Sequence, residues 1–191
     1  MTTVAPQRLS NLGLLAACVV VPRLLYLLLL LASDPDGDPQ GLRAVAWVVD
    51  WVCLTIAALT MFPLQRDFGG DDTRLWARVA AAGFALDAVT TLLSRYVELH
   101  WVVVTIAVVA WVGGLTRWLL ELCQRVGADY IVQRLWMISM LASYLVRFFR
   151  PEWPVFFFSF TILMIGLAVQ LALVARAIRD DGGRKHDISP P

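Results

Sequence analysis

Charged residues are scarce in this chain: they make up 16% of its 191 residues, whereas hydrophobic residues make up 59%. An average soluble domain has about 25% charged and roughly 45–50% apolar residues, so the composition argues against a soluble globular domain. Disorder is excluded too, because a disordered chain needs low hydrophobicity and high net charge. The net charge of +1 gives no electrostatic reason to expect nucleic acid as a partner.

Residue types that commonly hold cofactors are also rare. The single lysine, Lys185, lies near the C-terminus, so no apolar segment offers a lysine for a Schiff base of the kind found in retinal proteins. The two histidines are poorly placed to ligate a haem together, because His100 falls in a turn and His186 in the C-terminal tail. The three cysteines form no CxxC pair, and neither a redox motif nor a zinc site is indicated: Cys18, Cys53 and Cys123. We therefore expect no cofactor and no metal.

Long apolar runs dominate the remainder of the sequence. A run of about 18 or more apolar residues is long enough to cross a bilayer as a helix. Six segments qualify: 12–32, 44–64, 77–97, 101–122, 131–149 and 154–178. The sequence thus predicts an all-α, polytopic integral membrane bundle, with residues 1–179 as one domain in contact with the lipid bilayer. The fifth segment is the weakest, because Gln133 and Arg134 shorten its apolar part, and a re-entrant or interfacial helix is the alternative.

The distribution of basic residues predicts the orientation. With six spans and a cytoplasmic N-terminus, 11 Lys and Arg residues fall in cytoplasmic segments and 4 in external ones, leaving Arg23 within a span. Such an excess is typical of cytoplasmic segments. We expect both termini in the cytoplasm, residues 180–191 to form a flexible cytoplasmic tail, and the protein to reside in a bacterial-type plasma (inner) membrane. Seven of the eight tryptophans then fall near a membrane boundary, and only Trp111 lies in mid-span.

Three ionisable residues lie well inside the predicted spans: Arg23, Asp50 and Asp87. At 1.5 Å per helical residue, Arg23 and Asp87 are expected near the midplane, with Asp50 roughly 5 Å closer to the outer face. Unpaired, three such charges would cost roughly 8–10 kcal/mol on insertion scales. We expect Arg23 to pair with one carboxylate, leaving the second either protonated or in contact with water.

Small residues accompany these charges at helical spacing. Asp87 shares a face with Ala80 and Gly83, and small residues at such spacing let helices approach closely in lipid. We expect the first three spans to pack around the charges. Polar side chains on the last two spans, such as Gln170, are expected to bond to neighbouring helices instead of lining a pore.

Three interpretations of the buried charges remain open: a structural lock, a site for a proton or solute, and a contact with another subunit. Because the connections between spans are short, we expect a non-catalytic accessory, assembly or scaffold subunit that meets other membrane subunits or copies of itself. The alternative is a proton-coupled carrier or channel that uses Arg23, Asp50 and Asp87. No catalytic residue is assigned; Glu98 and His100 are the only pair that a lipid-modifying enzyme would offer, and they need not face each other.

Overall fold

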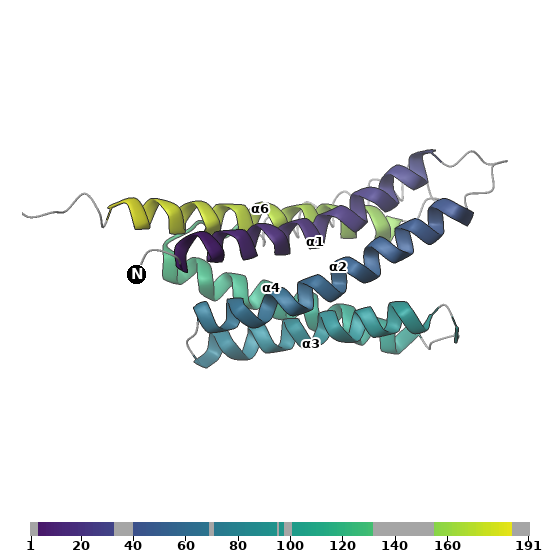
Figure 1. The fold of residues 1–191 in the computed structure, drawn as a ribbon, viewed down its shortest axis with the longest axis horizontal. Helices are drawn as coiled ribbons and strands as arrows, with labels where there is room; N and C mark the ends of the chain where they lie inside the picture. The colour runs from purple at the N-terminus through teal and green to yellow at the C-terminus, as the bar shows by residue number, and fades with distance from the viewer. Residues whose placement is uncertain are drawn as a thin grey trace, which may run out of the picture.

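The computed structural model describes residues 4–32, 40–68, 71–94, 96–97, 101–131 and 155–184. Within these ranges the regular structure is entirely helical (Figure 1). All five helices are long and apolar enough to cross a membrane. Their bounds are α1 Val4–Ala32, α2 Gln40–Asp67, α3 Asp71–Leu93, α4 Trp101–Val126 and α6 Val155–Arg184. The prediction of an all-α, multi-pass membrane protein is confirmed.

The helix boundaries refine the predicted spans. The described residues contain five long helices, not six, and the predicted span 131–149 lies outside them apart from Ile131. Helix α3 ends at Leu93, so the predicted span 77–97 extends four residues too far. Helix α6 continues to Arg184, five residues into the predicted tail 180–191, and the rest of that tail lies outside the described residues.

The first four helices form successive antiparallel pairs. Two ion pairs show this for α1 and α2: Arg8 lies 3.8 Å from Asp67, and Arg23 lies 3.5 Å from Asp50, so residue numbers rise on one helix as they fall on the other. Trp47 on α2 donates a hydrogen bond to the carbonyl of Thr91 on α3 at 2.8 Å.

Helix α6 packs against both α1 and α4. It runs parallel to α4. Trp111 contacts Phe160 and Cys123 contacts Gln170, so residue numbers rise in the same direction along both helices.

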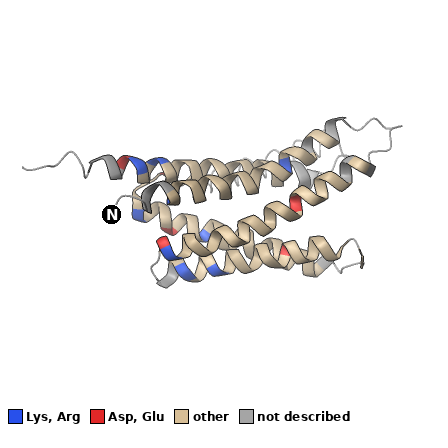
Figure 2. Ribbon diagram, in the orientation of Figure 1, with Lys and Arg blue, Asp and Glu red and all other residues tan. Residues whose placement is uncertain are grey.

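The two ends of the bundle differ in charge. Helix α1 begins and α6 ends at the same end, and Figure 2 shows that arginines gather there. We call this the basic end and the opposite one the distal end. Arginines at the basic end include Arg8, Arg66, Arg74, Arg78, Arg125, Arg176 and Arg179.

Close backbone contact joins α3 to α4. A Cβ added to Gly83 would collide with the backbone nitrogen of Trp111, and one added to Gly114 would lie 2.6 Å from the nitrogen of Ala80. The two helices therefore approach as closely as residues without Cβ atoms allow, which is how small residues promote helix association in lipid. This confirms that the small residues flanking Asp87 form a helix contact, although the partner is α4.

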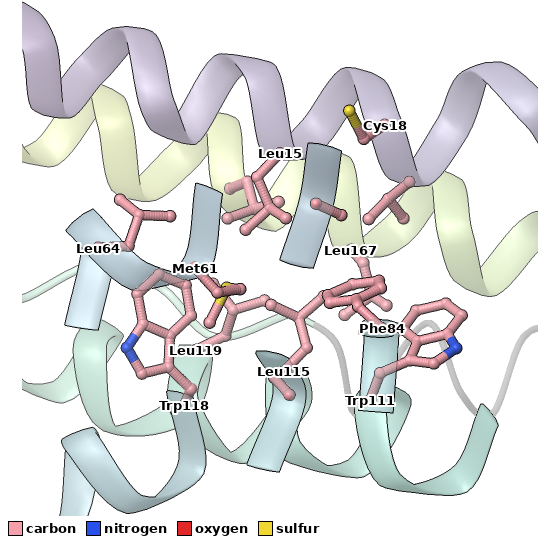
Figure 3. Close-up of a cluster of buried hydrophobic side chains, with 14 of the residues drawn as sticks. Leu15, Cys18, Met61, Leu64, Phe84, Trp111, Leu115, Trp118, Leu119 and Leu167 are labelled. Carbon is pink, nitrogen blue, oxygen red and sulfur yellow. The ribbon is translucent and has the colours of Figure 1, made fainter. Parts of the chain in front are cut away.

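Aromatic and aliphatic side chains fill the interior between these contacts (Figure 3). Phe84 stacks on Trp111 with ring centroids 4.7 Å apart, and both rings are buried. Trp118, which the sequence placed near a membrane boundary, is completely buried beside Phe68. Pro22 lies inside α1, which changes direction in its second half (Figure 1), as a proline in a helix interior causes.

Candidate intramembrane binding site

The three buried charges meet at one cavity of about 440 Å³. Its lining comes from all five described helices: Arg23 from α1, Asp50 from α2, Asp87 and Thr91 from α3, Val104, Thr105, Val108 and Val109 from α4, and Phe160 from α6. Ligand cavities in proteins commonly measure about 300–1,000 Å³. We call this space the intramembrane cavity.

Arg23 is paired with Asp50 and not with Asp87. Its Nη2 lies 3.5 Å from Asp50 Oδ1, and the side chains are 16% and 12% exposed. The guanidinium also stands over the ring of Phe160, 4.9 Å from its centroid. A cation over an aromatic face is stabilised by the ring quadrupole. Arg23 therefore ties α1 to both α2 and α6.

Asp87 has a different partner. Its Oδ2 accepts a hydrogen bond from the indole Nε1 of Trp111 at 2.9 Å, and both residues are buried. The indole is in turn fixed by its stacking on Phe84. Asp87 is thus held by a neutral donor from α4, while the nearby cation belongs to Asp50. The cavity therefore holds two carboxyl groups and one guanidinium, and it carries one excess negative charge when both carboxyl groups are ionised.

The two carboxylates lie at similar depths. Asp50 is six residues inside the candidate span Ala44–Asp67, and Asp87 is six residues inside the distal end of Thr73–Leu93, which corresponds to about 9 Å in each case. The sequence placed Asp87 roughly 5 Å deeper than Asp50. The hydrogen bond from Trp47 to Thr91 brings the two carboxylates to about the same level of the bundle, because Asp50 lies three residues after Trp47 and Asp87 four residues before Thr91. The cavity therefore lies in the distal half of the bundle.

Sequence reasoning missed the contribution of α4 and α6 to this site. The expected knot involved only the first three spans, whereas Trp111 holds Asp87 and Phe160 faces Arg23. One signal was available, since Trp111 is the only tryptophan placed in mid-span. A buried indole needs an acceptor for its N–H, and a buried carboxylate on a neighbouring helix provides one.

A second buried polar group closes the turn after α4. Gln170 lies on α6 and is fully buried. Its Oε1 accepts a hydrogen bond from the backbone nitrogen of Ile131 at 2.8 Å. Its Nε2 donates to the carbonyl of Asp129 at 2.8 Å and to Cys123 Sγ at 3.1 Å. Both ends of the amide are therefore bonded. This confirms that Gln170 bonds to its neighbours, and it explains how α6 is held beside α4.

The remaining sequence candidates lie away from the intramembrane cavity or outside the described residues. Cys18 is buried within α1, in keeping with a packing role. Glu98 and His100 lie outside the described residues. Among the residues that the structure describes, no three His, Cys, Asp or Glu side chains are placed to hold a metal ion.

Comparisons with known proteins assign no family. No family model, curated protein or solved structure matches this chain. The function must therefore be argued from the geometry of the site alone. That geometry offers carboxyl groups that can take up a proton, a guanidinium that can hold an anion, and aromatic rings that can face a cation.

Proposed function

We propose that the intramembrane cavity binds a proton or a small cationic solute and that the chain is a small proton-coupled carrier. The observation that supports this is the meeting of Arg23, Asp50 and Asp87 at a cavity lined by all five described helices. Charge in a membrane interior is costly, so the carboxylate in excess over Arg23 is best neutralised by a proton or a cation. Ionisable groups facing such cavities mark ion and proton pathways in membrane proteins.

Asp87 is the residue best suited to exchange its proton or cation. Asp50 already faces the guanidinium of Arg23, whereas the only hydrogen-bond donor described for the Asp87 carboxylate from another helix is the indole of Trp111. Asparagine in its place still offers an oxygen to that indole but cannot carry a proton as a carboxyl group does. The substitution therefore removes the proposed chemistry with little change in packing.

We expect Asp87→Asn to abolish proton uptake by protein reconstituted in liposomes, measured as the collapse of an imposed pH gradient with an internal fluorescent pH indicator. The matched control is Asp67→Asn, which removes a carboxylate that pairs with Arg8 at the basic end, outside the cavity. Wild type and Asp67→Asn should both exceed protein-free liposomes, and Asp87→Asn should match them.

Equal rates in wild-type, Asp87→Asn and protein-free liposomes would remove the proposal that the intramembrane cavity carries protons. The buried charges would then be a structural lock in a non-catalytic accessory or scaffold subunit. The short connection of residues 94–100 between α3 and α4 favours that second candidate, because it leaves little room for chemistry outside the membrane.

We also propose six crossings, with both termini on the cytoplasmic side of a plasma membrane. Helices α4 and α6 run in the same direction, so the chain has to return from the basic end to the distal end between Val126 and Val155. The span 131–149 that the sequence predicts would provide that return. The arginines at the basic end support a cytoplasmic location for it.

Single cysteines test this orientation in a chain whose three natural cysteines are replaced by serine. Tyr96 is 78% exposed at the distal end, and Gln124 is exposed near the basic end of α4. A membrane-impermeant maleimide should label the Tyr96→Cys protein in intact cells and the Gln124→Cys protein only after permeabilisation. The reverse pattern would invert the proposed topology.

A further inference from the structure

A second cavity, of about 460 Å³, lies between α1 and α6 at the basic end. Small residues of both helices form its wall: Gly13 and Ala16 on α1, Ala172 and Ala175 on α6. Gly13 and Ala172 are exposed, and a Cβ added to Gly13 would meet no atom within 4 Å. The two helices therefore leave an open apolar strip between them, which we call the α1–α6 groove.

The groove has an apolar part and a charged mouth. From Leu171 to Asp180 the whole lining covers ten residues of α6, or about 14 Å along the helix. Its apolar part on α1, from Leu9 to Ala16, is about 11 Å long, compared with about 15 Å for half of a hydrocarbon core about 30 Å thick. The groove can therefore accommodate most of the acyl-chain length that lies in one leaflet.

The mouth of the groove carries net positive charge. Arg176, Arg179 and Asp180 line it, giving two cations and one carboxylate. The Arg176 Nε to Asp180 Oδ2 distance is 3.9 Å, and these side chains are 80% and 67% exposed. Ion pairs this exposed are weak, so both guanidinium groups can turn toward an anion. Guanidinium groups are well suited to phosphate because their N–H groups bind two oxygens at once.

We infer that the α1–α6 groove binds one anionic phospholipid. Its acyl chain would lie along Gly13, Ala16, Ala172 and Ala175, and its phosphate would meet Arg176 and Arg179. Basic pockets between membrane helices hold acidic lipid headgroups by this combination of apolar wall and cationic mouth. A second copy of the chain would bring its own basic end, and hence more positive charge, to the same mouth. The near end of the groove, at Leu171, lies about 17 Å along α6 from Phe160, and no residue lines both the groove and the intramembrane cavity.

Thermal unfolding and native mass spectrometry of the full chain in mild detergent test the inference. Phosphatidylglycerol should raise the unfolding midpoint and give a species with one added lipid, whereas phosphatidylcholine and inorganic phosphate should do neither. Replacing both Arg176 and Arg179 with glutamine should weaken phosphatidylglycerol binding about thirtyfold, since each cation contributes roughly fivefold. The control replaces Arg74 and Arg78, which are exposed at the same end on α3, with glutamine.

A steric variant tests the acyl-chain part separately. Gly13→Leu should fill the groove and abolish the phosphatidylglycerol effect, and its Cβ would meet no atom within 4 Å. Gly113→Leu on α4 is the matched control, since Gly113 is also an exposed helical glycine with no atom near its added Cβ.

Any of three results would overturn the proposal. The first is equal stabilisation by phosphatidylcholine or inorganic phosphate. The second is equal phosphatidylglycerol binding by the two glycine variants or by the two arginine double variants, and the third is a second copy of the chain in place of the lipid.

Discussion

Replacing Gly83 with valine is expected to lower the free energy of unfolding by about 3 kcal/mol or more. The added Cβ would fall on the backbone of Trp111, which cannot rotate away as a flexible side chain can, so α3 and α4 would have to separate. Such a separation would also pull the indole of Trp111 away from Asp87. The loss should appear as a lower midpoint of denaturation in detergent micelles, followed by circular dichroism.

The matched control for this change is Gly113→Val. Gly113 is also a helical glycine, but it is exposed, and its added Cβ would meet no atom within 4 Å. Both substitutions place the same β-branched residue in a helix, so they share any effect of helix propensity. The difference between them therefore measures the α3–α4 contact, and equal midpoints for the two variants would contradict the close approach at Gly83.

The second large effect is expected at the buried ion pair. Removing one partner of such a pair leaves an uncompensated charge and typically costs about 3–5 kcal/mol. We expect Asp50→Asn and Arg23→Gln each to cost about 3 kcal/mol, and the double variant to cost less than the sum of the two. The coupling energy from this double-mutant cycle should be about 2 kcal/mol or more.

Arg8 and Asp67 provide the comparison pair. They are also an Arg–Asp pair between α1 and α2, but their side chains are 36% and 25% exposed, against 16% and 12% for Arg23 and Asp50. Exposed pairs contribute at most about 1 kcal/mol, because water screens them. The cycle of Arg8→Gln with Asp67→Asn should therefore give a small coupling energy. If the two cycles gave the same value, burial would not be the reason for any effect at Arg23 and Asp50.

The expected loss of stability at the Arg23–Asp50 pair also decides which carboxylate is the better probe of function. Asp50→Asn is expected to destabilise the bundle, so a loss of proton flux in that variant would not identify the proton-binding group. Asp87→Asn retains an acceptor for Trp111 and is the sharper probe of the intramembrane cavity. Flux lost in Asp87→Asn at unchanged thermal stability would point to chemistry and not to packing.

Much of the architecture could be read from local sequence. Hydropathy is a property of consecutive residues, so five of the six predicted spans coincide with helices that can cross a membrane. The same pattern predicted charges inside the bundle, where Asp50 and Asp87 are buried and Arg23 is half-buried. Helix ends were less accurate, because hydropathy is averaged over many consecutive residues: the predicted span ran past Ser94 and Arg95 to Val97, whereas α3 ends at Leu93.

The pairing of the buried charges depended on contacts between helices that are distant in sequence. Arg23 can reach either carboxylate by depth alone, and the choice of Asp50 follows from the α1–α2 contact, while Asp87 is held by Trp111 across the close approach at Gly83. The parallel course of α4 and α6, which brings Phe160 to Arg23, has no signature in either helix by itself. Composition and hydropathy thus determined that this is a helical membrane protein with buried charge. The rotation and packing of its helices decided which groups share a cavity, because those depend on the shapes of surfaces far apart in the chain.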